Sequence, residues 1–294
     1  MRWTRGDRGN IEDVRSGGGG FRGLPLGRGL PIGIGGIVIL LLLSLYTGTD
    51  FLSLLGGGGG GALPPSASVG EGGGPVASSP EEEKLVDMVD AVMQDAQETW
   101  TSLLGNQYQP TRVRLFRDAV QSACGFAESA SGPFYCPGDQ RVYLDLGFFD
   151  ELRRRFGAPG DFAQAYVITH ELGHHVQALT GIEEQVRRAQ QGNPSRANEL
   201  SVRMELQADC FAGVWGHTAA QQGRAAQGKV ELDPGDVEEG LRAAAAIGDD
   251  RIQRMSSGRV FPEKFTHGSS EQRVTWFRRG LESGDPDACN TYGR

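Results

Sequence analysis

Residues Tyr166–His175 read YVITHELGHH, and within them His170, Glu171 and His174 have the spacing H-E-x-x-H. Residues four apart lie on one face of a helix, so two imidazoles can converge on one metal ion. Glu171 lies beside them, where its carboxylate can reach a water molecule next to the ion instead of the ion itself. The pattern predicts a zinc site of the hydrolytic kind on a buried helix. Two surface histidines on an ordinary helix are the alternative interpretation.

Two acids further along the chain supply a candidate for the third metal ligand. Residues Met204–Cys210 read MELQADC, and Glu205 and Asp209 are again four apart, on one face of a predicted helix. A catalytic zinc ion takes three protein ligands and keeps one position open. We therefore assign Glu205 as the third ligand and Asp209 as the acceptor of the free N–H group of His170. A solvated acidic stripe is the alternative.

Another histidine lies in residues Phe265–Arg273, which read FTHGSSEQR. His267 precedes a predicted helix cap formed by one of the two serines. A histidine there could donate a hydrogen bond to the oxyanion that forms when a peptide carbonyl is attacked, which makes His267 a candidate catalytic residue. Arg273, one turn inside the helix, would hold His267 or an acidic partner. A surface histidine beside a helix cap is the alternative.

The hydrophobic periodicity outside these motifs is mostly helical. The spacing of apolar residues predicts helices at 147–156, 162–179, 195–220, 236–247 and 269–282. Alternation of apolar and polar residues predicts only two strands, at 111–116 and 140–146. Ser79, Pro80 and the three acids that follow predict the start of a further helix. These patterns indicate an α+β domain, mostly helical with a small sheet, over residues 81–294.

An uncharged segment near the N-terminus predicts a transmembrane helix. Residues 29–49 hold no charged side chain, and about 20 helical residues span the hydrocarbon core of a bilayer. Six arginines lie in residues 1–28, so we expect this Arg/Gly-rich leader in the cytoplasm and the domain outside it. A cleaved signal peptide is the alternative, with the small residues Gly48 and Thr49 at the cleavage site.

The composition changes between this segment and the predicted domain. Glycine makes up 45 of the 294 residues and gathers before residue 75, so it does not indicate disorder throughout. Residues 50–80 are rich in Gly, Pro and Ser, which is typical of a flexible linker. The domain that follows has about 210 residues, enough for a hydrophobic core of its own.

The distribution of charge excludes one class of partner. The chain carries a net charge of −8, but residues 1–28 hold six arginines and three acids, a charge of +3, which leaves −11 for the remainder. Contacts with phosphate need a basic face. We therefore expect no binding of nucleic acid by the domain.

The four cysteines predict two disulfides in an exported domain. Cys124 and Cys136 enclose a short loop, and closing a loop of this size stabilises the fold by about 3 kcal/mol on the entropy model. Of the three possible connectivities we favour Cys124 with Cys136 and Cys210 with Cys289. Four buried thiols are the alternative, which would apply to a cytoplasmic domain.

Taken together, these motifs make the chain similar to a known family, the putative neutral zinc metallopeptidases of bacteria. The resemblance extends over nearly the whole chain apart from residues 56–80, and includes a single anchor after a Gly-rich leader. Its motifs lie at Met1–Trp3, Ser122–Gly125, Gly132–Pro137, Val142–Leu146, His170–Gln177, Glu205–Trp215, Thr266–Arg273 and Cys289.

The resemblance implies a zincin-like metallopeptidase domain with one zinc ion. His170, His174 and Glu205 would bind the ion, Glu171 would act as the general base, and Asp209 would orient a ligand. The leading hypothesis is a membrane-anchored peptidase that hydrolyses peptide or protein substrates. Two alternatives stay open: a zinc-containing scaffold that holds a partner at the membrane without cutting it, and a zinc amidase that acts on a non-protein amide.

Overall fold

The helix predicted to start at Ser79 is the longest of the fold. The computed structural model describes residues 1–15 and 78–292. In it α2 runs over Pro80–Leu104, and the hydroxyl of Ser79 accepts a hydrogen bond from the backbone N–H of Glu82. Three glutamates in its first turn stabilise the helix, because their negative charges lie near the positive end of the helix dipole. The apolar side of α2 is buried and packs into the main core of the unit.

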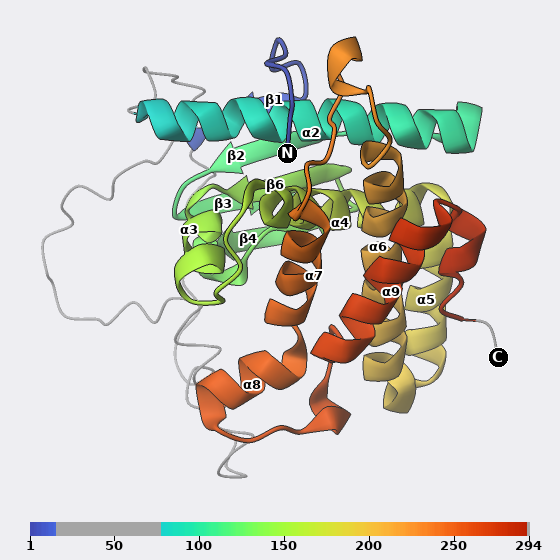
Figure 1. Cartoon of the computed structure of the whole chain (residues 1–294). Coiled ribbons are helices and arrows are strands. Elements are labelled where there is room, and N and C mark those ends of the chain that lie inside the picture. Colours follow the sequence, from blue (N-terminus) through green and yellow to red (C-terminus); the bar gives the residue numbers. More distant parts are fainter. Residues whose placement is uncertain (16–77, 293–294) are drawn as a thin grey trace, which may run out of the picture. The chain divides into compact units, whose positions relative to one another are not determined.

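A four-stranded sheet lies beside α2 (Figure 1). Its two central strands, β2 (Arg112–Phe116) and β6 (Arg141–Asp145), occupy the two predicted strand segments and pair in parallel. The outer strands are β1 (Ile11–Asp13), parallel to β2, and β5 (Phe134–Cys136), antiparallel to β6. The alternating valines and leucines of the central strands enter the core, as the period of two requires.

Four of the strands have no clear pattern in the sequence. Besides β1 and β5, these are β3 (Ala119–Ser122) and β4 (Gly125–Glu128), which form a separate two-stranded hairpin. Each has three or four residues, too few for an alternation to stand out. Their structure depends on pairing with partners instead of on local preference.

The predicted helices are present, with ends within two residues of the expected ones. They are α3 (Gly147–Arg154), α4 (Asp161–Leu179), α6 (Ala197–Ala219), α7 (Asp236–Ala246) and α9 (Ser270–Ser283). Two helices are additional, α5 (Ile182–Gly192) and α8 (Asp249–Ser257), and each buries a single residue. Their apolar stripes are short, with Ile182, Val186 and Ala189 on α5 and Ile252 and Met255 on α8. Short 3-10 helices lie at Gly105–Gln107, Ser129–Ser131, Pro194–Arg196, Ala225–Gln227, Pro262–Lys264 and Pro286–Cys289.

Helix α6 lies at the centre of the helical layer, in contact with α4, α5 and α9 (Figure 1). Glycines allow α6 and α9 to touch through their backbones. A Cβ atom on Gly280 would lie 1.9 Å from the carbonyl oxygen of Cys210, and one on Gly213 would lie 2.2 Å from that of Phe277. Both distances are impossible for real atoms, so only glycine permits this crossing.

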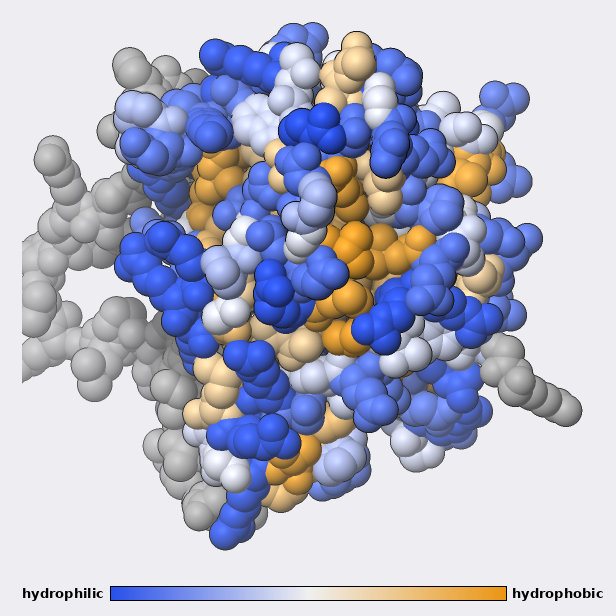
Figure 2. All heavy atoms as spheres, viewed as in Figure 1, coloured by the Kyte–Doolittle hydropathy of each residue, from blue (hydrophilic) through white to orange (hydrophobic). Residues whose placement is uncertain are grey.

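Hydrophilic side chains cover most of the face seen in Figure 2, with hydrophobic ones gathered near its middle.

Both disulfides have the favoured connectivity. Cys124, in the turn of the β3–β4 hairpin, is bonded to Cys136 of β5, and Cys210 of α6 is bonded to Cys289. The second bond joins residues 79 apart in the sequence and ties the C-terminal end of the described chain to helix α6. The predicted pairing is therefore confirmed.

The N-terminal predictions have a mixed outcome. The expected anchor at 29–49, and almost all of the linker at 50–80, lie outside the described residues. Within residues 1–15 and 78–292, no helix is long and apolar enough to cross a membrane. Residues 1–15 differ from the expectation of a separate leader, because β1 joins the sheet and this segment belongs to the same compact unit as the domain.

The crossing of α6 and α9 gives a test of the fold. We expect Gly280→Ala to lower the free energy of unfolding by about 3 kcal/mol or more, because the added methyl group collides with the backbone of α6. Gly192→Ala is the matched control, since nothing lies within 4 Å of a Cβ atom there. Thermal and denaturant unfolding measure the difference. Equal stability of the two variants would contradict the close crossing.

Candidate metal centre

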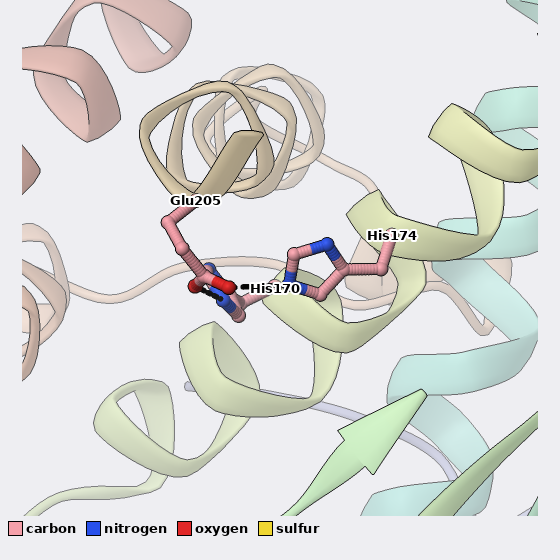
Figure 3. A group of neighbouring side chains, drawn as sticks. All are labelled: His170, His174 and Glu205. Atoms are coloured by element: carbon pink, nitrogen blue, oxygen red, sulfur yellow. Dashed lines mark hydrogen bonds and ion pairs between the residues drawn. The ribbon is translucent and has the colours of Figure 1, made fainter. Parts of the chain in front are cut away.

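The site depends on a second close crossing, between α4 and α6. A Cβ atom on Gly173 would lie 3.0 Å from both the Cα and the carbonyl oxygen of Ala208, so the two helices meet almost backbone to backbone. His170 and His174 lie on α4 on either side of this contact, and Glu205 lies on α6. Figure 3 shows the carboxylate of Glu205 reaching from α6 toward both imidazoles.

The three side chains have the spacing of a metal site. His170 Nε2 lies 3.1 Å from one carboxylate oxygen of Glu205, and His174 Nε2 lies 3.5 Å from the other. One ligand atom from each of the three residues lies within 4.8 Å of the others. Nitrogen and oxygen ligands about 2.0–2.1 Å from a tetrahedral zinc ion are about 3.3 Å apart. The residues therefore fit a zinc ion, bound through both Nε2 atoms and the carboxylate.

A buried ion pair orients His170. Its Nδ1 lies 2.9 Å from Asp209, a carboxylate that is fully buried. Arg273 of α9 donates to Asp209 from Nε and Nη2, each over 2.8 Å, and the hydroxyl of Tyr166 donates to the same carboxylate. Burial alone would raise the pKa of Asp209, but Arg273 and His170 outweigh it and hold that pKa below its usual value. The charged carboxylate keeps the proton of His170 on Nδ1 and leaves Nε2 for the ion.

A glutamine orients His174 in the same way. The Nδ1 atom of His174 lies 2.9 Å from the side-chain oxygen of Gln177, which is fully buried. The amide nitrogen of Gln177 donates to the carbonyl of Met204, over 2.8 Å, and to the side-chain oxygen of Gln207, over 3.0 Å. Because these two bonds use the amide hydrogens, the oxygen faces His174 and accepts its Nδ1–H. The Nε2 lone pair of His174 is thus directed to the site.

The electrostatics of the cluster favour a cation. Burial opposes protonation of both imidazoles, yet Asp209 and Glu205 raise the pKa of His170 to about 10, and Glu205 raises that of His174. Burial opposes ionisation of Glu205 as well, but the two histidines hold its pKa well below the usual value. The cluster thus stabilises an added positive charge, which a divalent ion would supply if it were held by the Nε2 atoms and Glu205 in place of protons.

The ligands and Glu171 line one cleft of about 620 Å³, together with His267. Glu171 is 8% exposed, and within residues 1–15 and 78–292 its carboxylate takes part in no hydrogen bond or ion pair. Its carboxylate is therefore available to a substrate or a water molecule in the cleft. Much of the wall is apolar, including Phe134, Tyr135, Phe148, Phe156, Ile247 and Ile252.

His267 lies on the cleft and is held by Asp249, an acid that no sequence motif indicates. Its Nδ1 lies 3.2 Å from one oxygen of Asp249, the first residue of α8. The other oxygen accepts hydrogen bonds from the backbone N–H groups of Thr266, His267 and Gly268, over 2.7, 2.7 and 3.1 Å. The hydrogen bond to Asp249 raises the pKa of His267. Of the two partners predicted for Arg273, the structure shows the acidic one, Asp209.

Three residues with a role in this arrangement were missed: Tyr166, Gln177 and Asp249. Tyr166 lies four residues before His170, and Gln177 three residues after His174, so both share the inner face of α4 with the ligands. That spacing is a signal that could have identified them. Asp249 follows Gly248 at the start of α8. This position is typical of a helix start, but it gives no sign of the contact between Asp249 and His267.

Comparison with known proteins assigns the chain to a family. The sequence model of the family described as "putative neutral zinc metallopeptidase" matches residues 1–292, and the chain belongs to that family. Escherichia coli K12 has a relative, the uncharacterized protein YpfJ, 46% identical over 302 residues that cover 100% of this chain and 99% of the relative. The uncharacterized protein Rv2575 of Mycobacterium tuberculosis H37Rv is 47% identical over 197 residues, 66% of each chain. No solved structure matches.

The orientation of His170 can be tested through metal affinity. We expect Asp209→Asn to weaken zinc binding about 10- to 100-fold, because the neutral amide no longer fixes the Nδ1–H tautomer. Glu199→Gln is the matched control, an exposed acid on the same helix. Competition with a chromogenic chelator gives the affinities, and circular dichroism reports whether each variant is folded. A folded Asp209→Asn variant that binds zinc as tightly as the control would show that Asp209 does not orient the ligand.

Proposed function

We propose that the chain is a zinc-dependent peptidase that hydrolyses peptide bonds. The observation that carries the proposal is the cluster of His170, His174 and Glu205 at zinc-ligand spacing, beside a carboxylate, Glu171, that has no partner in the described chain. Membership of a family of zinc metallopeptidases supports it. A site that only bound metal for stability would have no use for an unpaired acid next to the ligands.

Glu171, His267 and the three metal ligands each have a part in this chemistry. Zinc held there supplies Lewis acidity, which polarises a carbonyl group and lowers the pKa of a water molecule to about 7. Glu171 accepts a proton from the attacking water on its carboxylate and donates it to the leaving nitrogen. In its protonated form, with Nδ1–H directed to Asp249, His267 can donate to the oxyanion from Nε2. The raised pKa of His267 favours that form.

The cleft suits a peptide substrate. Its volume of about 620 Å³ lies within the range of about 300–1,000 Å³ that is usual for ligand sites, and its aromatic and aliphatic wall can bury side chains next to the scissile bond. Peptides and proteins are therefore the proposed substrates. No feature of the cleft favours a non-protein amide or a scaffold that holds a partner.

We further propose that the chain is attached to the cell membrane through residues 29–49, with the catalytic domain outside the cytoplasm. The apolar sequence of that segment supports the attachment. The two disulfides support the compartment, because such bonds persist in oxidising surroundings and are rare in the cytoplasm.

Glu171→Gln tests the chemistry separately from the metal. We expect peptide hydrolysis to fall about 10²- to 10⁴-fold, because glutamine cannot accept the proton, while the zinc content stays at one ion per chain. Glu183→Gln, another acid on the cleft, is the matched control and should keep most of the activity. Turnover of a peptide library and elemental analysis give the two readouts. If Glu171→Gln hydrolyses peptides at the control rate, the proposed role of Glu171 is wrong.

His267→Ala tests the oxyanion donor. We expect kcat to fall about 10²-fold with KM and zinc affinity nearly unchanged. The wild-type kcat should also decline as pH rises through the pKa of His267, which lies above the ordinary value of 6.5, because deprotonation removes the Nε2 donor. That decline should be missing in His267→Ala. Equal kcat for the variant and the wild type across the pH range would exclude this role.

A further inference from the structure

The N-terminal segment is a structural part of the catalytic unit. Strand β1 pairs in parallel with β2, with Ile11 opposite Val113, Glu12 opposite Arg114 and Asp13 opposite Leu115. Backbone hydrogen bonds run both ways, from Val113 N–H to the carbonyl of Asn10 over 2.8 Å and from Val14 N–H to that of Leu115 over 2.9 Å. Without β1, the edge of β2 would lose these bonds.

The side chains of the segment also pack against the domain. Met1, Trp3 and Ile11 pack against the main hydrophobic core, and Val14 packs against the smaller one. Asp90 of α2 is 1% exposed, and its hydrogen-bond donors are the backbone N–H groups of Arg8 and Asn10 and the side-chain amide of Asn10. A buried carboxylate whose donors all come from one segment is strong evidence that the segment and α2 are specific partners.

The arginines of the segment have partners in the domain. Arg15, whose side chain is 1% exposed, pairs with Glu82 over 2.7 Å and with Glu83 over 3.2 Å. Arg8 pairs with Glu83 and Asp87, each over 2.6 Å. Arg2 pairs with Glu231 and Asp233, and Arg5 pairs with Asp87.

These pairs change the interpretation of the arginines in the leader. The prediction of a cytoplasmic N-terminus used six arginines as a retention signal. Four of the six, Arg2, Arg5, Arg8 and Arg15, form ion pairs with the domain and so have a structural role. The other two, Arg22 and Arg28, lie outside the described residues.

A strand can pair only with a strand on its own side of a membrane. If residues 29–49 crossed a bilayer once, about 30 Å of hydrocarbon would separate β1 from β2. We propose that residues 1–15 lie in the same compartment as the catalytic domain. This replaces the predicted cytoplasmic N-terminus with one on the side of the domain.

A cysteine pair in the full chain tests the proposal. Glu12→Cys and Arg114→Cys replace opposed residues whose side chains approach to 3.3 Å, and a protease recognition sequence replaces Gly56–Gly61. Intact cells are treated with diamide, a membrane-permeant oxidant, and free thiols are then alkylated. After solubilisation and proteolysis, a non-reducing gel shows whether the two fragments are joined. We expect most molecules to be joined.

The control and the contradicting outcomes use the same gel. Glu12→Cys with Arg188→Cys, on the exposed side of α5, should give no joined fragments. Fragments that join only when diamide is added after solubilisation would mean that the membrane separates the strands, and the proposal would be wrong. Failure to join under both conditions, in protein that still binds zinc, would show that β1 does not pair with β2.

A second measurement does not depend on the engineered cysteines. Arg15→Glu should lower the midpoint of thermal unfolding by about 10 °C, both in the membrane-extracted protein and in intact cells. The reason is that a buried negative side chain would then face two glutamates and Asp13. Arg5→Glu, at an exposed position, should change both far less. If residue 15 were across the membrane from the domain, Arg15→Glu would leave the stability in cells unchanged.

Discussion

The metal ligands can meet because α4 and α6 touch with almost no side chain between them. Gly173 and Ala208 define that contact, and the ligands lie immediately around it. A second contact of the same kind, between Gly280 and the backbone of Cys210, holds α9 against α6. Arg273 on α9 is thereby placed against Asp209, and Asp209 against His170. The geometry of the site therefore depends on two glycines as much as on the ligands.

The buried polar groups behind the ligands fix the orientation of the two imidazole rings. Asp209 is removed from water but has Arg273, Tyr166 and His170 as partners, which offsets the cost of burying its charge. Gln177 is equally buried, with both amide hydrogens and its oxygen in use. Such groups add little to stability, but they set which nitrogen of each imidazole faces the cleft.

The sequence predicted those features that depend on local spacing. His170, His174 and Glu205 follow from residues four apart on helices, and β2 and β6 follow from alternation. Features that depend on contacts beyond local spacing were missed: β1 pairs with a strand about a hundred residues away, and Asp249, at the start of α8, meets His267, 18 residues further on. Helices α5 and α8 were missed for a different reason, since each is short, buries only one residue and has only two or three apolar residues at helical spacing.

The metal ligands form the floor of the cleft and lie on tightly packed helices, whereas part of its wall comes from other elements. The two ligand helices meet at Gly173 and Ala208, and a disulfide next to Asp209 ties α6 to Cys289, so almost any enlargement there would disturb the metal site. The wall residues Phe148, Glu183 and Ile252 come instead from α3, α5 and α8, peripheral elements that supply no ligand. Selectivity for substrate can therefore diverge between related chains, or be redesigned in this one, by exchanging wall residues while the chemistry of the floor stays intact.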